Sequence, residues 1–227
     1  EGPKEDLHIF SPDGDGNKDS FAINLSGSHE ELWTLSVEDA AGTPVRSFDI
    51  IDGSPSPIIW DGKNDSGQIV ADGVYRFMAQ SIDRAANECR ASLENIIVNT
   101  EQPVVNILIN DPYFSPNGDG VKDFLVLYPQ VPQTSGAQTW KLEVLDGKNI
   151  VQKTLGATGS IPREISLDGR DDREKALPEG SYRAKFTVVY QNGSEPHALS
   201  PAFALDITAP TANLSAKHTA FSPNGDG

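Results

Sequence analysis

Apolar and polar residues alternate along much of the chain, so that every second side chain would face the same way on an extended strand. The sequence WTLSV, for example, places Trp33, Leu35 and Val37 on one face. Gly, Pro, Asn, Asp and Ser cluster between segments of this kind, as turns require. No helix of three turns is expected. The pattern predicts an all-β protein with short strands at 21–25, 33–37, 75–81, 94–99, 124–128, 140–144, 182–190 and 203–207.

The chain repeats itself with a period of slightly more than 100 residues. The decapeptide FSPDGDGNKD begins at Phe10, FSPNGDGVKD begins at Phe114, and FSPNGDG begins at Phe221. Trp33 recurs as Trp140, and the sequence WDGKNDSGQIVADGVY recurs as LDGRDDREKALPEGSY. A period of this length is too long for a solenoid repeat and matches a module with its own core.

Many short strands in modules of this size are typical of immunoglobulin-like or fibronectin III-like β-sandwiches. We therefore expect two such tandem modules, at residues 1–102 and 103–209, and the start of a third, truncated repeat at 210–227. The first two modules meet in the sequence NTEQPVVNI. A proline directly between two strands makes a short and stiff connection, so the modules are expected to form a semi-rigid rod.

The repeated motif is the best candidate for a binding site. Asp13, Asp15, Asn17 and Asp19 place oxygen atoms at every second position, with glycines between them. Calcium loops wrap a hard cation in this way, because Ca²⁺ takes about six to eight oxygen ligands. The corresponding candidate ligands of the later copies are Asn117, Asp119, the carbonyl of Val121, Asp123, Asn224 and Asp226. A single loop supplies too few ligands, so other loops or waters would complete the shell.

The alternative interpretation of the motif is a tight turn. Pro-Asn-Gly-Asp-Gly favours consecutive turns in which Asx side chains accept hydrogen bonds from nearby backbone amides. Phe10 and Phe114 would then anchor the turn in the core. This interpretation accounts for the Phe, Ser, Pro and Gly residues, but it gives no role to the final aspartates, Asp19 and Asp123. The similar spacing of oxygens in WDGKNDSG is interpreted as a hairpin turn.

Composition excludes several classes of function. The chain carries 18 basic and 33 acidic residues, a formal net charge of −15, which opposes binding to nucleic acid or to an anionic membrane. Its one cysteine, Cys89, permits no intramolecular disulfide and no cysteine-based zinc site. No apolar run is long enough to span a membrane. The histidines (His8, His29, His197 and His218) form no catalytic motif, so no enzymatic activity is expected.

Two sequences carry a family resemblance. WDGKNDSGQIVADGVY resembles the immunoglobulin-like domain of the flagellar hook-capping protein, and FSPNGDGVKD is similar to the opening of gliding-motility-associated C-terminal modules of bacterial surface proteins. The core of the motif also resembles the calcium loops of dockerins and thrombospondin type 3 repeats. The second repeat departs from the first pattern at Leu167 and Arg173. The resemblance implies a bacterial, extracytoplasmic, non-enzymatic array of Ig-like modules.

Three functions remain open from the sequence. The first is a structural or adhesive module array of a cell-envelope or secreted protein, which acts as a spacer or scaffold stiffened by calcium, with neighbouring modules as its partners. The second is a calcium-dependent carbohydrate-binding module, which would need exposed aromatic residues on one face. The third is an accessory region of a secreted hydrolase. Any protein or glycan ligand is unidentified at this stage.

Overall fold

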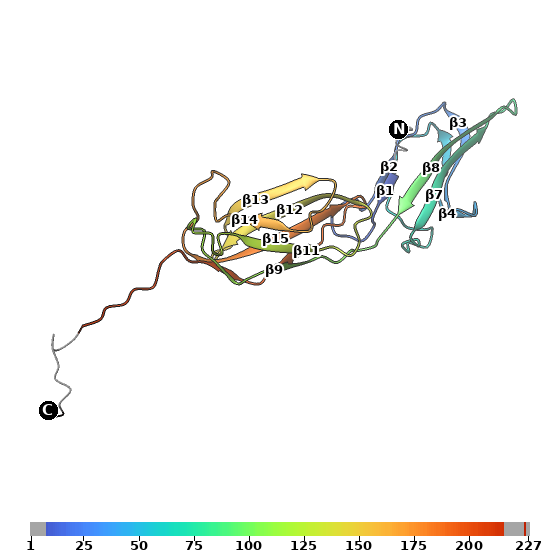
Figure 1. The fold of residues 1–227 in the computed structure, drawn as a ribbon. Helices are drawn as coiled ribbons and strands as arrows, with labels where there is room; N and C mark the ends of the chain where they lie inside the picture. The colour runs from blue at the N-terminus through green and yellow to red at the C-terminus, as the bar shows by residue number, and fades with distance from the viewer. Residues whose placement is uncertain (1–7, 216–224, 226–227) are drawn as a thin grey trace.

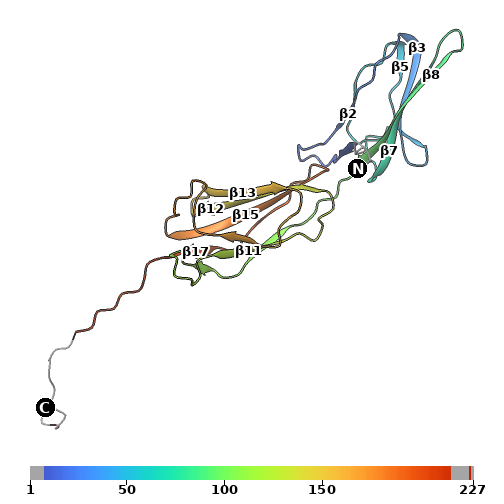
Figure 2. The same ribbon diagram turned by 45° about the horizontal axis from the view of Figure 1, so that its top comes forward.

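The computed structural model describes residues 8–215 and 225. Within this part, the chain forms two β-sandwich bodies that lie end to end, and the chain leaves the second body as an extended segment (Figures 1 and 2). All regular secondary structure of the described residues is β-strand, which confirms the predicted all-β fold. None of these residues forms a helix long and apolar enough to cross a membrane.

The first body, here called module 1, is built from two sheets. One sheet has the order β1-β8-β7-β3-β4, with β5 also paired to β3, and the other consists of β2 and β6. Strand β1 pairs in parallel with the end of β8, so that Phe10 lies opposite Val98 and the first motif starts beside the chain that leaves the module. The strands of module 1 are β1 (His8–Phe10), β2 (Phe21–Ile23), β3 (Glu30–Glu38), β4 (Pro44–Ser47), β5 (Ile50–Gly53), β6 (Ile58–Trp60), β7 (Gly73–Ile82) and β8 (Glu88–Val98).

The second body, module 2, repeats this arrangement. Its larger sheet has the order β10-β17-β15-β12-β13, with β16 paired to β15, and its smaller sheet has the order β14-β11-β9. Strand β10 pairs in parallel with β17, as β1 does with β8. The strands of module 2 are β9 (Asn106–Ile109), β10 (Tyr113–Phe114), β11 (Leu125–Gln130), β12 (Ala137–Asp146), β13 (Val151–Thr158), β14 (Ile165–Leu167), β15 (Gly180–Tyr190), β16 (His197–Leu199) and β17 (Phe203–Leu205).

Each module has a separate hydrophobic core. The buried apolar residues of module 1 lie between Phe10 and Val98, and those of module 2 lie between Val105 and Leu205. The alternation read from the sequence points these side chains inward, because successive residues of a strand face opposite sides of the sheet. The predicted join at residues 102–103 falls between the two sets. Its exact place remains a prediction.

The tryptophans of the repeat occupy equivalent positions but differ in burial. Trp33 lies opposite Ser81, and Trp140 lies opposite Val188 at the matching place in the second sheet. Trp33 is buried and donates its indole N–H to the carbonyl of Ser28. Trp140 is only half-buried, and its indole nitrogen has no hydrogen-bond partner among the described residues. The sequence repeat predicts that Trp33 and Trp140 are both buried, and this prediction is wrong for Trp140.

Trp60 has a larger role than the sequence indicated. We expected it to begin a turn, but it is fully buried at the end of β6 and contacts Phe10 and Tyr75 edge-on, with ring centroids 5.3 and 5.4 Å away. Its indole N–H donates to the carbonyl of Lys63. Leu167 fills the equivalent position of module 2 and is also buried. The hairpin turn expected after Trp60 is present, closed by the bridge between Lys63 and Ile69.

The two sequence motifs of each module touch one another. Gly62, of the sequence WDG, has a φ of +70°, and a Cβ atom at this position would lie 2.5 Å from the ring of Pro12. Gly169 and Pro116 repeat this contact at the same distance in module 2. A side chain is excluded at both glycines by sterics and by backbone conformation. The motif loop of each module is thus seated on the turn that follows β6 or β14.

Candidate metal centre and the joint between the modules

The first motif forms a compact loop after β1, which we call loop 1 (residues 11–19). Phe10 anchors it in the core, and the backbone N–H of Ser11 donates to the carbonyl of Lys18 and closes it. Gly14 and Gly16 have φ angles of +83° and +93°. L-residues rarely adopt this conformation, which explains why glycine occupies both positions.

Asp19 holds loop 1 in shape. One of its carboxylate oxygens accepts the backbone N–H of Gly14 at 2.7 Å, and the other accepts that of Gly16 at 2.9 Å. Asp13 accepts the N–H of Asp15, and Asp15 accepts that of Asn17. Asp13 and Asp15 therefore form two consecutive Asx turns, and Asp19 joins two glycine amides that precede it. The turn interpretation left Asp19 without a role, and the structure supplies one.

The second motif forms loop 2 (residues 115–123) with the same backbone. Asp123 accepts the N–H groups of Gly118 and Gly120, both at 2.8 Å. Asn117 takes the place of Asp13 and accepts the N–H of Asp119, while its own amide N–H donates to the Asp119 carboxylate at 3.0 Å. Loop 2 thus reproduces the hydrogen bonds that the backbone N–H groups of loop 1 donate to its side chains, with one carboxylate fewer.

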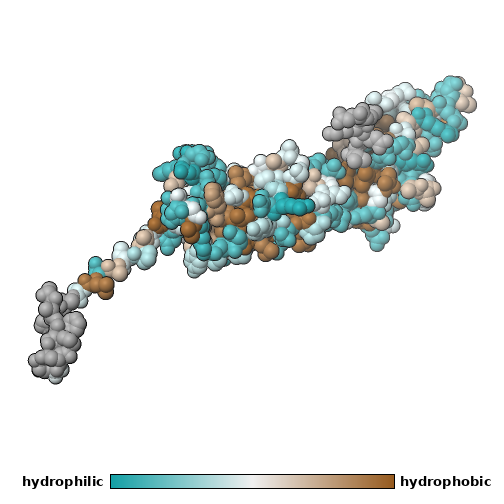
Figure 3. Space-filling model, viewed as in Figure 1, coloured by the Kyte–Doolittle hydropathy of each residue, from teal (hydrophilic) through white to brown (hydrophobic). Residues whose placement is uncertain are grey.

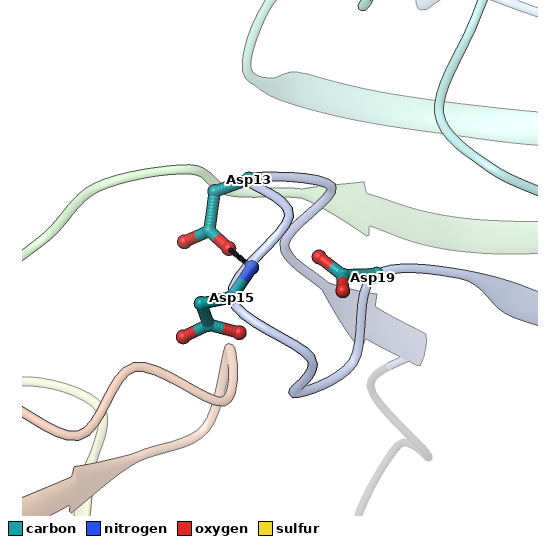
Figure 4. Close-up of side chains that lie close together, drawn as sticks. All are labelled: Asp13, Asp15 and Asp19. Carbon is teal, nitrogen blue, oxygen red and sulfur yellow. Dashed lines mark hydrogen bonds between the residues drawn. The ribbon is translucent and has the colours of Figure 1, made fainter.

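The three carboxylates of loop 1 lie close together, as Figure 4 shows. Asp13, Asp15 and Asp19 each offer an oxygen within 4.8 Å of the others. Ca²⁺–oxygen distances are about 2.3–2.6 Å, so oxygens at this spacing fit around one such ion. Their hydrogen bonds do not prevent this, because a carboxylate has about four lone-pair sites. Among the described residues, no Lys or Arg forms an ion pair with any of the three.

The other predicted ligands are placed differently. Asn17 donates its N–H within loop 1, while its carbonyl oxygen faces Gly193 of module 2. Val121 gives its N–H to Asp119, and its side chain is exposed. Asp119 and Asp123 are the only carboxylates of loop 2. The predicted ligands of the third copy, Asn224 and Asp226, lie outside the described residues.

Loop 1 also forms part of a joint between the modules. The turn that connects β15 and β16 reaches from module 2 to module 1, and its residues Asn192, Gly193 and Ser194 are buried. Such a turn normally lies exposed at the tip of a sheet. The side-chain amide of Asn192 donates to the carbonyls of Asn99 at 3.1 Å and of Glu101 at 2.9 Å, both in the connecting segment.

Further contacts tie loop 1 to this joint. The ammonium group of Lys18 donates to the carbonyl of Gln191 at 2.6 Å. A Cβ atom on Gly193 would lie 2.9 Å from the carbonyl oxygen of Asn17, so module 2 packs directly on the loop backbone. Asp15 lines a hollow between the modules together with Glu195, and Figure 4 shows the module 2 chain passing beside Asp15. The three carboxylates of loop 1 therefore lie at the boundary of the two modules.

The connecting segment affects the ionisation of Asp13. Burial raises the pKa of this carboxyl group, but hydrogen bonds from Gln102, the Asp15 backbone and Ser11 outweigh burial and lower the pKa below its usual range. Gln102 belongs to the connection between the modules, and its amide lies 3.2 Å from the Asp13 oxygen. A residue of the connection thus helps to favour the charged form of Asp13.

The three histidines that the structure describes do not converge on a site. His29 lies 3.9 Å from Asp52, with both side chains largely exposed. His8 contacts the ring of Phe21, and His197 lines the hollow between the modules. His218 lies outside the described residues. Cys89, the sole thiol, is exposed on β8.

Sequence reasoning missed the joint residues. The Asn192-Gly193 pair was visible as a hairpin signal, but nothing local shows that such a turn packs against another module. Its Asn side chain is used between modules and not within the turn alone. Only the stiff proline connection pointed towards a fixed joint.

Comparison with known proteins identifies the type of module. Residues 9–84 match the family model of the FlgD Ig-like domain, which confirms the resemblance seen in the sequence. The first module is thus Ig-like, and module 2 repeats its strand order. The match covers about a third of the chain. No curated protein sequence matches.

Several solved structures overlap with the chain at low identity. A tetra-tandem repeat in the extending region of a large adhesion protein is 18% identical, with a TM-score of 0.38 over 83% of this chain and 45% of that chain. A 1.5-MDa bacterial ice-binding adhesin is 9% identical, with a TM-score of 0.42 over 82% and 56%. Fibronectin(III)-like modules of Clostridium thermocellum CbhA are 10% identical, with a TM-score of 0.45 over 94% and 98%. The chain spans about half the length of the first two. Likeness at this level says nothing about function.

Proposed function

From an Ig-like first module and its structural repeat, we propose that the chain is a non-enzymatic spacer or scaffold that holds other parts of a bacterial extracytoplasmic protein at a fixed separation. The observation that carries this proposal is the buried turn Asn192–Ser194, which is seated on module 1. A flexible string of modules would leave this turn in water. A rod needs such a contact at each joint.

Hydrogen bonds within module 1 support the stiffness of the joint. Asp72 accepts both the N–H and the hydroxyl of Thr100 at 3.0 Å, which fixes the connecting segment to its own module before module 2 is reached. Asn192 then binds two carbonyls of that segment. Pro103 is buried at the entry of module 2 and has a restricted φ. A segment held at both ends has few conformations available.

Calcium is proposed as an additional brace. An ion held by Asp13, Asp15 and Asp19 would lie in loop 1, beside the hollow between the modules that Asp15 lines. Loop 1 is well formed by its own hydrogen bonds, so the ion would stiffen the loop and would not be required for it to form. The three clustered charges support binding of a divalent cation.

The alternatives receive less support from the described residues. A carbohydrate-binding face needs exposed aromatic side chains, but Trp33 and Trp60 are buried and Trp140 is half-buried. Within residues 8–215, the exposed large aromatics are Tyr113 and Phe124, on either side of loop 2. A role as an accessory region of a secreted hydrolase is compatible with a spacer and depends on flanking domains.

The distance across the joint tests the proposal. Spin labels on Cys89 and on a Thr158→Cys variant, both exposed, would report the separation of the modules by double electron–electron resonance. A narrow distribution is expected, and Asn192→Ala should broaden it. Gln152→Ala, which removes a side-chain amide donor at the far end of module 2, is the matched control and should change nothing.

A flexible reference completes this experiment. Insertion of four Gly and Ser residues after Gln102 would release the joint, because such linkers behave as random coils. If the native chain gives a distribution as broad as this reference, the spacer proposal is wrong.

A further inference from the structure

We infer that the opposite end of module 2, formed by loop 2 and residues 206–208, is a docking surface for the β-hairpin turn of a further module of the same kind. This inference rests on the proposed spacer function and extends it to a particular surface and partner. The joint already present between modules 1 and 2 is its template. The sequence begins a third copy of the motif at Phe221, which is consistent with a module in that position.

The segment that leaves module 2 is held in the same way as the segment that leaves module 1. Glu179 accepts the N–H of Ile207 and the hydroxyl of Thr208, both at 2.8 Å. Asp72 does this for Thr100 in module 1. Hydrogen bonds from Thr208 and Ile207 lower the pKa of Glu179, so the carboxylate form that accepts both bonds is favoured.

The acceptors for a docking turn are also in place. Asn192 binds the carbonyls of Asn99 and Glu101, where the N–H of Glu101 donates to the Asn99 side chain at 2.8 Å. At the end of module 2, the N–H of Thr208 donates to the Asp206 side chain at 3.0 Å. The same local turn is therefore formed at the same offset from the last strand. The carbonyls of Asp206 and Thr208 thus occupy the positions of the two acceptors of the first joint.

Apolar side chains are exposed around this site. Ile9 lines the first joint, and its equivalent in module 2 is Tyr113, which is 61% exposed. Val121, at the position of Asn17, is 65% exposed, and Ile207 is 50% exposed. Figure 3 shows hydrophobic residues on the surface at this end of module 2. Burial of such residues would favour docking, since the removal of apolar surface from water is favourable.

The template specifies the chemistry of the partner. Its turn must present a side-chain amide to two backbone carbonyls, as Asn192 does. The next residue must be glycine, because a Cβ atom on Gly193 would come 2.9 Å from the carbonyl of Asn17. The expected partner is therefore an Asn-Gly turn at the near end of a following Ig-like module.

A chain with three modules tests this inference. Residues 210–227 are replaced by a second copy of residues 103–209, which brings its own core and its own Asn-Gly turn. Cys89 and Thr158→Cys report the first joint. In a separate Cys89→Ser chain, Thr158→Cys and the same substitution in the added copy report the second joint. Narrow distance distributions are expected at both joints.

Substitutions at the proposed surface should act on the second joint alone. Val121→Glu, or Asn192→Ala in the added copy only, should abolish the narrow peak of the second joint and leave the first unchanged. Calorimetry would show that the added copy is folded in each chain. The reference for a free joint carries four Gly and Ser residues inserted after Ala209.

The outcomes separate the two proposals. A narrow first joint with a second joint as broad as the reference would refute the docking surface and leave the spacer function intact. A broad first joint would contradict the spacer function, and the inference would fall with it. A narrow second joint that is insensitive to both substitutions would also refute the proposed surface, because the stiffness would then come from other contacts.

Discussion

Loop 1 and loop 2 have the same backbone but different surroundings. Lys18 and Lys122 have φ angles of +52° and +54°, and in both loops a final aspartate accepts two glycine N–H groups. The common part of the motif therefore forms a turn. What differs is chemistry at the surface, because loop 1 has a third carboxylate, Asp13, where loop 2 has Asn117.

The surroundings of the two loops differ because loop 1 lies at the joint between the modules. Ser11 is buried in loop 1, whereas its equivalent Ser115 is only partly covered. Lys18 donates to module 2, but Lys122 forms an ion pair with Asp111 of its own module at 2.7 Å. The same turn thus contacts another module in loop 1 and only its own module in loop 2. The comparison teaches that the common residues of the motif set the backbone of the turn and that its variable positions set the chemistry of the exposed surface.

The largest expected effect concerns whether the two modules unfold independently of one another. Trp60→Ala should destabilise module 1 by about 3–5 kcal/mol, because it leaves a large cavity at the centre of the core. Module 2 should unfold at an unchanged denaturant concentration, which NMR signals assigned to each module would follow. Leu167→Ala is the reciprocal control and should affect module 2 alone. Equal losses in both modules would show one cooperative unit.

Calcium is expected to act differently on the two loops. Millimolar Ca²⁺ should raise the melting temperature of module 1 more than that of module 2, because loop 1 has three carboxylates and ligand charge sets calcium affinity. The stabilisation is about 2.7 kcal/mol when the ion is at 100 times its Kd. Mg²⁺ should act less, since it demands stricter octahedral geometry. Calorimetry with metal-stripped protein measures both effects.

Single substitutions locate the ion. Asp15→Ala should remove most of the calcium response of module 1, and Asp119→Ala should remove the smaller response of module 2. Melting that is the same in calcium and in chelator, without a heat of binding, would reduce both loops to turns.

The final aspartates test the shared part of the motif. In chelator, Asp19→Ala and Asp123→Ala should each cost their module about 1–2 kcal/mol, because each removes two charge-assisted hydrogen bonds that are partly open to solvent. Chemical denaturation of each variant measures this. In calcium, the loss should grow for Asp19→Ala more than for Asp123→Ala. If neither substitution changes the stability of its module, the structural role that we assign to these carboxylates is wrong.

Much of the fold could be predicted from the sequence. Alternation located the strands that bury one face, because such burial leaves a period of two, and the repeat indicated two cores. The eight-residue strand β13 was missed, because none of its side chains is fully buried. Short elements such as β10 escaped, since two residues show no period. Trp60 was misplaced because the following WDG turn signal outweighed its apolar side chain, although the structure buries that side chain before the turn begins.

The site was predicted less completely. Residues of loop 1 were identified because they are adjacent in sequence, and three of them do converge. The role of Asp19 as a hydrogen-bond acceptor depends on the path of the backbone, which spacing does not show. Gln102 contacts loop 1, and Asn192 contacts the connecting segment, although both are far from their partners in the sequence. Contacts between modules leave no periodic pattern, so they required the structure.

The smallest effect that distinguishes the loops is pH dependence at Asp13. Its folded-state pKa is lowered, so it contributes stability that is present above the unfolded pKa of about 3.9 and is lost as pH falls through the folded value. Loop 2 has the non-ionising Asn117 at this position. Gln102→Ala should raise the pKa of Asp13, because it removes a hydrogen bond to the carboxylate, and should weaken this acid dependence of module 1. Carboxyl ¹³C NMR titration measures the pKa directly. Gln133→Ala, which removes a different amide hydrogen bond to the connecting segment, should leave this pKa unchanged. Equal shifts in both variants would mean that the position of the joint, and not the hydrogen bond from Gln102, sets the pKa of Asp13.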